Sequence, residues 1–151
     1  MRLVTLTTDG AADPNPGRGG WAFIARCPRV IERSGTVPAP TSSNRMELTA
    51  VIEGLKSLEE PCQVTLISDS RYVVDGVNCW RLHWRANGWT TRSKTPVLNL
   101  DLWQAIDELC QRHTVTAKWV KGHSGHLDNE RCNELAEAQA TKHTDLPAPG
   151  M

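Results

Sequence analysis

The most constraining feature of this chain is the order of its strand and helix patterns. Three segments with apolar residues at alternate positions come first, and helical and strand patterns alternate from residue 45 onward. The predicted strands are residues 3–8, 21–27, 30–36, 64–68 and 115–120, and the predicted helices are residues 45–58, 71–78, 98–112 and 128–142. This order predicts an α/β fold with a five-stranded mixed sheet, three antiparallel strands followed by parallel ones, and helices on both faces.

The length and charge of the chain restrict its class. A chain of 151 residues forms one domain that buries about two-thirds of its unfolded surface. We expect this domain to span residues 1–143 and a flexible, proline-containing tail to span residues 144–151. The 17 basic and 17 acidic residues balance, so affinity for nucleic acid must come from local clusters of charge.

The cysteines and the first apolar segment indicate the compartment. Five cysteines, an odd number without any C-x-x-C pair, argue against a disulfide framework and against a zinc site. A reducing compartment fits best. The apolar stretch after Met1 is short and interrupted by threonines, so neither a signal peptide nor a membrane span is expected. We therefore expect a cytoplasmic protein without a membrane partner, and a monomer.

Three acidic residues stand where this fold can direct them into one site. Asp9 and Asp69 follow the first and fourth predicted strands, and Glu47 lies in the first turn of the first predicted helix. Right-handed crossovers would place the ends of those two strands side by side. Carboxylates without cysteine or histidine favour Mg²⁺ or Mn²⁺ over zinc. The sequence therefore favours a metal-assisted phosphoryl-transfer site.

Each of these acidic residues also has a purely local interpretation. Asp9 precedes Gly10 and could belong to a turn, and Asp69 could cap the following helix. Asn44 as N-cap with Glu47 three residues later is close to a capping box. Taken singly, the capping role is preferred for Glu47. Taken together, the three residues favour the metal site.

Residues 79–97 form a basic segment rich in tryptophan. No acidic residue occurs between Asp75 and Asp101. The segment carries Trp80, Arg81, Trp84, Arg85, Trp89, Arg92 and Lys94. Basic side chains interleaved with aromatic rings are typical of a nucleic-acid-binding surface. The four-residue spacing of Trp80 and Trp84 equally fits packing on one helical face.

Six groups of residues resemble the motifs of type 1 ribonuclease H, the enzyme that cleaves RNA in RNA–DNA hybrids. They occur in the family's order and spacing from residue 3 to about residue 138. They are Thr8-Asp9-Gly10, Asn15-Pro16-Gly17, Ser43-Asn44-Arg45-Met46-Glu47, Ser68-Asp69-Ser70, Trp119-Val120-Lys121-Gly122-His123-Ser124-Gly125-His126 and Asn129-Glu130-Arg131-Cys132-Asn133-Glu134-Leu135-Ala136. One such motif is weak, whereas six at the right spacing are specific.

The resemblance implies a catalytic set and its metal. Asp9, Glu47 and Asp69 would be metal-binding carboxylates, and His123 the mobile catalytic histidine between Gly122 and Gly125. A solvent-exposed loop histidine is the alternative, and it suits His126 better. The implied cofactor is a pair of Mg²⁺ ions, with Mn²⁺ as a substitute.

One position departs from the family pattern. Asn133 stands where the family normally has a fourth metal-binding aspartate. An amide oxygen can coordinate a hard cation but brings no negative charge. A hybrid-binding module with impaired catalysis is therefore one alternative function. A DNA-cutting relative of the same fold is another.

The resemblance also implies the contacts with an RNA–DNA hybrid duplex, the expected partner. Residues at positions that contact the RNA strand are Asn15, Ser43, Asn44 and Arg71, where the family more often has glutamine at the position of Arg71. Residues at positions that contact the DNA strand are Ser42, Trp80, Trp84, Arg85, Trp89, Arg92, Lys94 and Asn99.

Overall fold

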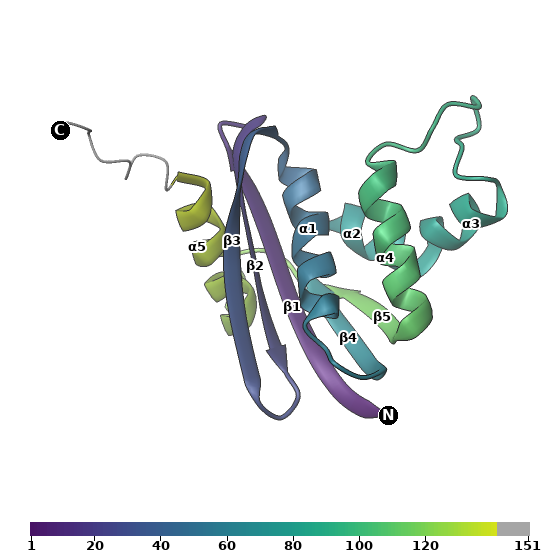
Figure 1. Cartoon of the computed structure of the whole chain (residues 1–151). Coiled ribbons are helices and arrows are strands. Elements are labelled where there is room, and N and C mark those ends of the chain that lie inside the picture. The colour runs from purple at the N-terminus through teal and green to yellow at the C-terminus, as the bar shows by residue number, and fades with distance from the viewer. Residues whose placement is uncertain (142–151) are drawn as a thin grey trace.

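Five strands form one mixed sheet in the order β3-β2-β1-β4-β5 in this computed structural model, which describes residues 1–141 (Figure 1). The strands are β1 (Arg2–Asp13), β2 (Gly17–Arg26), β3 (Val30–Thr41), β4 (Cys62–Ser68) and β5 (Thr114–Trp119). The helices are α1 (Ser43–Lys56), α2 (Arg71–Asp75), the π-helical turn η1 (Gly76–Trp80), α3 (Arg81–Ala86), α4 (Leu100–Arg112) and α5 (Leu127–Thr141).

The predicted fold class is confirmed. β1, β2 and β3 pair antiparallel, whereas β4 pairs parallel with both β1 and β5. The first and fourth strands are therefore neighbours, as expected from right-handed crossovers. Two helices expected from the sequence, α1 and α4, pack together on one side, while α5 covers the opposite face of β1 and β2 (Figure 1).

The core is divided unequally between the two faces. The larger part lies between the sheet and α1, where Leu6, Phe23, Leu48, Leu55 and Leu66 are fully buried. The part beneath α5 is smaller and contains Ala22, Ile24, Cys132 and Ala136. Small side chains there let α5 approach the sheet closely, since a Cβ added to Gly20 would lie 2.1 Å from a carbonyl oxygen of α5. The position of α5 is therefore fixed tightly against β1 and β2.

Two strands continue well past their predicted ends. β1 continues to Asp13 instead of ending at residue 8, because residues 9–13 pair with residues 18–22 of β2. β3 continues to Thr41, although the proline-containing residues 37–41 suggested a loop. β3 is an edge strand, where a proline without an N–H group is tolerated on the unpaired side. Pairing across strands thus overrode the local turn signals.

The segment between β4 and α4 is more helical than predicted. Residues 71–86 form a continuous succession of α2, η1 and α3, and an irregular loop follows from residue 87 to residue 99. We call residues 71–99 the arm (Figure 1). The predicted basic segment, residues 79–97, lies within it, and its first half is helix rather than loop.

Other boundaries fall close to the expected ones. α1 begins two residues earlier than predicted, α4 begins two residues later, and α5 begins at Leu127. The expected end of α5 at residue 142, the domain boundary at residue 143 and the tail 144–151 lie outside the described residues. Within residues 1–141, none of the helices has the length and apolar character needed to cross a membrane.

Candidate metal centre and active site

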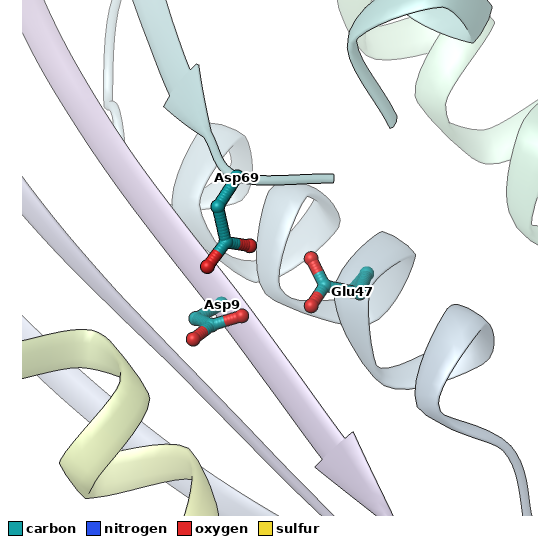
Figure 2. A group of neighbouring side chains, drawn as sticks. All are labelled: Asp9, Glu47 and Asp69. Carbon is teal, nitrogen blue, oxygen red and sulfur yellow. The ribbon is translucent and has the colours of Figure 1, made fainter. Parts of the chain in front are cut away.

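Three carboxylates from separate elements converge on one point of the structure (Figure 2). Asp9 comes from β1, Glu47 from α1, and Asp69 from the residue that follows β4. One ligand oxygen from each lies within 4.8 Å of the others. This is the distance range at which carboxylates can share bound cations.

Asp9 lies inside a strand and not at its end. It pairs with Ala22 of β2, so the prediction of a strand end and the alternative of a turn residue are both wrong. On its other side, the pairing of β1 with β4 stops at Thr7 opposite Ile67. β1 therefore continues past the end of β4, and Asp9 and Asp69 face the gap that this leaves.

Glu47 reaches the same gap because α1 approaches β1 at Gly10. A Cβ on Gly10 would lie 2.3 Å from the carbonyl carbon of Met46, so only glycine permits this contact. The Gly10 N–H group donates to Glu47 Oε1 at 3.2 Å and to Asp9 Oδ1 at 2.9 Å. One backbone amide thus links two of the three carboxylates.

The capping-box interpretation of Glu47 is wrong. Ser42 is the N-cap of α1, and its Oγ accepts a hydrogen bond from the Arg45 N–H group at 3.2 Å. Glu47 then lies in the second turn, beyond the position from which a side chain returns to the cap. Asp69 does not cap α2 either, because Ser70 is the N-cap and accepts from Val73 at 3.2 Å.

The centre concentrates negative charge without a cation. Asp9 and Glu47 are only 2% and 8% exposed, and Glu47 Oε2 has no hydrogen-bond partner. Within residues 1–141, these three carboxylates take part in none of the ion pairs. Burial raises the pKa of Glu47 well above its ordinary value, and the charge of Asp9 raises it further. Burial and Asp9 likewise raise the pKa of Asp69. A divalent cation would offset both the burial of these negative charges and the repulsion between them.

Asn133 of α5 contacts this centre. Its Nδ2 donates a hydrogen bond to Asp9 Oδ2 at 3.0 Å. The residue stands beside the carboxylates, and its amide nitrogen points toward Asp9. Its oxygen would face Asp9 only after a half-turn of the amide group, so a ligand role for Asn133 stays a prediction.

The beginning of α5 differs from the prediction. Asp128, at which the predicted helix began, does not cap it and instead accepts two hydrogen bonds from Arg26, at 2.7 Å and 2.8 Å. His126 performs the capping, because its Nδ1 accepts from the Asn129 N–H group at 3.1 Å. His126 is therefore half-buried and structural rather than a free loop residue. The neutral imidazole nitrogen replaces the usual serine or aspartate oxygen.

Asn129 is a site residue that the sequence did not single out. It is 1% exposed, its Nδ2 has no hydrogen bond of good geometry, and its amide lowers the pKa of the Asp69 carboxyl. It lies one helical turn before Asn133, which is the only sequence signal that could have indicated it. A buried amide beside a carboxylate cluster can orient that cluster.

The His123 loop lies against Asp69. A Cβ on Gly122 would stand 2.9 Å from Asp69 Oδ2, and the positive charge of His123 lowers the Asp69 pKa. His123 itself is exposed and has a left-handed backbone conformation, with φ of 56°. An exposed imidazole beside a buried carboxylate can exchange protons between solvent and the site.

The residues assigned to the RNA strand gather in part. Asn15 Oδ1 accepts from the Ser43 N–H group, and Ser43 Oγ accepts from the Ala12 N–H group, both at 3.2 Å. Asn44 follows Ser43 in the first turn of α1. Arg71, at the start of α2, places its guanidinium carbon 4.1 Å from the ring centre of Trp119.

Two of the residues assigned to the DNA strand meet at Arg45. Ser42 caps the helix through the Arg45 N–H group, and Asn99 Oδ1 accepts from Arg45 Nη1 at 3.3 Å. Asn99 also donates to the Tyr72 hydroxyl at 3.1 Å, in a left-handed conformation with φ of 58°. This places polar groups from α1 and from the end of the arm in one cluster.

The arm uses most of its aromatic rings for packing. Trp80 and Trp84 pack at 5.9 Å between ring centres, and Trp84 packs at 5.4 Å against the fully buried Trp103. Trp89 is packed against the same core. The packing interpretation therefore holds for Trp84, whereas Trp80 remains 41% exposed and available to a ligand.

The basic residues of segment 79–97 fall into two groups. Arg81 and Arg85 both pair with the buried Asp107 of α4, at 2.8 Å and 3.3 Å. Arg92 and Lys94 form no ion pair among the described residues and line an open hollow of about 470 Å³ beside Trp84. The cations of this segment that remain available to an anionic ligand are therefore Arg92 and Lys94, at the tip of the arm, whereas Arg85 already has a partner.

Comparison with known proteins gives consistent matches over nearly the whole chain. A family model described as RNase H matches residues 1–141. Ribonuclease H of Hydrogenovibrio crunogenus is 53% identical over 90% of this chain and 94% of that protein. Ribonuclease HI of Pseudomonas syringae pv. tomato is 50% identical, over 88% and 89% respectively. The crystal structure of LC9-RNase H1, a type 1 RNase H with the type 2 active-site motif, is 30% identical with a TM-score of 0.79, and the match covers 93% of this chain and 72% of that one.

Proposed function

Because this chain belongs to the ribonuclease H family, we propose that it hydrolyses the RNA strand of RNA–DNA hybrids at the centre formed by Asp9, Glu47 and Asp69. The chain is a ribonuclease H and an endonuclease, as the sequence motifs indicated. The single observation that supports this assignment of the site is the convergence of three carboxylates, two buried and one partly buried, with no ion-pair partner within residues 1–141.

The residues of the centre fit hard divalent cations. Three carboxylates with a partnerless Glu47 Oε2 form an all-oxygen donor set of the kind that Mg²⁺ prefers and Mn²⁺ also accepts. Asp9, Glu47 and Asp69 would hold the ions, and Asn133, which is hydrogen-bonded to Asp9, would be a further ligand. Bound ions would supply an activated water and neutralise developing charge, giving 5′-phosphate and 3′-hydroxyl ends.

His123 would act as the proton donor in this hydrolysis. It is exposed, lies on the loop beside Asp69, and can give a proton to the leaving 3′ oxygen or assist product release. Asn129 would keep the Asp69 carboxylate oriented from the opposite, buried side. The two residues thus act on one carboxylate from the solvent side and from the core.

Two surfaces would hold the hybrid on either side of the centre. Asn15, Ser43, Asn44 and Arg71 would contact the RNA strand, whose 2′-hydroxyl groups both donate and accept hydrogen bonds. Ser42 and Asn99 would bind a phosphate of the DNA strand, and the arm would hold the same strand farther along. Within the arm, Arg92, Lys94 and the exposed ring of Trp80 are the groups best placed for this, with Trp84, Arg85 and Trp89 beneath them.

We test this function with three labelled duplexes of one sequence: RNA–DNA, RNA–RNA and DNA–DNA. We expect cleavage of the RNA strand of the hybrid alone, in Mg²⁺ or Mn²⁺ and not in EDTA. Cleavage of the DNA duplex would indicate a DNA-cutting relative. Tight binding of the hybrid without cleavage in either metal would indicate a binding module impaired by Asn133.

We further propose that the protein is a cytoplasmic monomer. All five cysteines are free, which suits a reducing compartment. The hybrid-binding surfaces described above come from one chain. Light scattering of the purified protein at micromolar concentration would give the mass of one chain, and twice that mass would contradict the proposal.

A further inference from the structure

One side chain of the arm pairs with the main chain of β5 at the edge of the sheet. β5 is an edge strand, with β4 as its only neighbour in the sheet. Asn78 of η1 donates from Nδ2 to the Ala117 carbonyl oxygen at 2.9 Å, and its Oδ1 accepts from the Ala117 N–H group at 2.9 Å. The amide therefore pairs with both main-chain groups that a further strand would have used.

The π-helical turn gives Asn78 this position. η1 interrupts the regular helix between α2 and α3, and such turns commonly mark functional positions. The helical segment that follows is anchored separately, because Arg81 donates to the Val77 carbonyl at 2.9 Å and pairs with Asp107 at 2.8 Å. Asn78 is thus held by a rigid part of the arm.

β5 leads from Asn78 directly to the catalytic side of the molecule. Two residues after Ala117, the Trp119 Nε1–H group donates to the Asp69 carbonyl oxygen at 3.0 Å. The next residue, Val120, donates its N–H to Ser68 at 3.0 Å. Gly122 and His123 follow and lie against the Asp69 carboxylate. A displacement of β5 at Ala117 would therefore move the His123 loop relative to Asp69.

We infer that Asn78 is a positioning residue, which fixes β5 to the arm and thereby holds the His123 loop in place against Asp69. The Asn78 amide joins the arm, which would bind the hybrid, to β5, which leads into the loop of the proposed proton donor. This inference rests on the role proposed for His123. Both side-chain hydrogen bonds of Asn78 are formed with Ala117, and neither involves the carboxylates or the residues assigned to the RNA and DNA strands.

Asn78→Ala removes both bonds, and Asn87→Ala is the matched control. Asn87 is also an amide of the arm, but its Nδ2 donates to the His83 carbonyl at 2.8 Å, within the same helical segment. Amide hydrogen exchange followed by NMR should be at least tenfold faster at Ala117 and Val120 in Asn78→Ala and unchanged in Asn87→Ala. Native exchange at Val120 in Asn78→Ala would overturn the inference.

A double-mutant cycle with His123→Ala tests whether Asn78 affects cleavage through His123. At saturating hybrid in Mg²⁺, Asn78→Ala should slow single-turnover cleavage about tenfold and leave hybrid affinity in Ca²⁺ unchanged. In the His123→Ala background, the same change should slow cleavage less than about twofold, because the loop no longer supplies the imidazole. An equal loss in both backgrounds would overturn the link to His123. A native rate for His123→Ala alone would refute the role proposed for that histidine, while the exchange rates would still decide whether Asn78 fixes β5.

Discussion

The carboxylate centre and the contact between the arm and α4 both bury acidic side chains, but the charge is compensated in only one of them. At the contact, Asp107 of α4 is 3% exposed and accepts hydrogen bonds from Arg81 and Arg85 of the arm and from Gln111. In the centre, Asp9 and Glu47 are also buried, and neither forms an ion pair with any basic side chain within residues 1–141. Paired buried charge serves structure, whereas unpaired buried charge of one sign requires an external partner. This difference in charge compensation distinguishes the proposed metal centre from the scaffold.

The same contrast distinguishes the basic residues of the arm. Arg81 and Arg85 belong to the scaffold because Asp107 holds them, whereas Arg92 and Lys94 at the tip have no ion-pair partner within residues 1–141. Within segment 79–97, the uncompensated positive charge therefore lies at the tip of the arm. Five variants test whether this division between scaffold and function holds.

The largest effect is expected at Asp69. Asp69→Asn removes a charge from the centre with little loss of packing, and hybrid cleavage at saturating Mg²⁺ should fall by about 10³-fold. Circular dichroism should show an unchanged fold. The control is Asp75→Asn, an acidic residue six positions later at the end of α2, which should cleave at the native rate. Full activity of Asp69→Asn would remove Asp69 from the metal centre.

The next largest effect is expected on stability, at the contact between the arm and α4. Asp107→Asn leaves the buried Arg81 without its counter-ion and should lower the free energy of unfolding by about 3 kcal/mol. Urea denaturation measures this change. The control, Asp101→Asn, breaks the exposed Arg45–Asp101 pair, where the side chain of Asp101 is 65% exposed, and should cost less than about 1 kcal/mol. An equal loss of unfolding free energy in the two variants would show that burial does not distinguish the Arg81–Asp107 pair from the Arg45–Asp101 pair.

A tenfold effect on binding is expected at the tip of the arm. Replacing Arg92 and Lys94 together by alanine should raise KM for the hybrid about tenfold and leave kcat near its native value, because these groups bind ground and transition states alike. The salt dependence of affinity should also become shallower, by about two in the log–log slope. Replacing Arg29 and Arg33 of the distant β2–β3 hairpin removes the same charge and should change neither quantity. A lowered kcat with an unchanged KM would contradict a binding role.

Asn133→Asp should change the requirement for metal. The new carboxylate would stand beside Asp9, where Asn133 now donates at 3.0 Å, and it adds charge to the donor set. The Mg²⁺ concentration for half-maximal cleavage should fall about fivefold, while hybrid affinity in Ca²⁺ stays the same. Asn87→Asp in the arm should leave the metal titration unchanged. An unaltered titration for Asn133→Asp would exclude Asn133 as a ligand.

The smallest effect is expected on the free energy of unfolding, from the unpaired charge of Glu47. The folded-state pKa of Glu47 lies above its unfolded value, so the folded protein binds the proton more tightly. The free energy of unfolding therefore decreases as pH rises from the ordinary glutamate range through the raised pKa. Glu47→Gln removes this dependence and should stabilise the metal-free protein at pH 7 by about 1 kcal/mol, with a smaller gain near pH 5.

Thermal unfolding in EDTA at the two pH values measures this gain, and cleavage by Glu47→Gln should be lost. Glu53→Gln on the same helix is the control and should change neither stability nor cleavage. A destabilised Glu47→Gln protein would show that the carboxylate contributes favourably to the fold without metal.

The sequence by itself determined the fold class, the order of the elements and the identity of the carboxylates. Alternation of apolar residues is a local property that does not depend on the partner strand, so the order of strands and helices could be predicted. The positions of Asp9, Glu47 and Asp69 along that order then placed them together. Asn133 was identified only through the resemblance to the ribonuclease H family, because an asparagine in a helix has no metal-binding signal of its own.

Only the tertiary structure decided how each residue is used. β1 extends past Asp9 because β2 offers pairing partners that no local signal reveals, and α1 begins at Ser43 because Ser42 rather than Asn44 caps it. Asp107 lies twenty-two residues from Arg85, and Ala117 lies thirty-nine from Asn78, so neither pairing leaves a periodic trace. Burial and hydrogen bonding depend on which surfaces meet in three dimensions, and they determine whether a charge belongs to the scaffold or to the site.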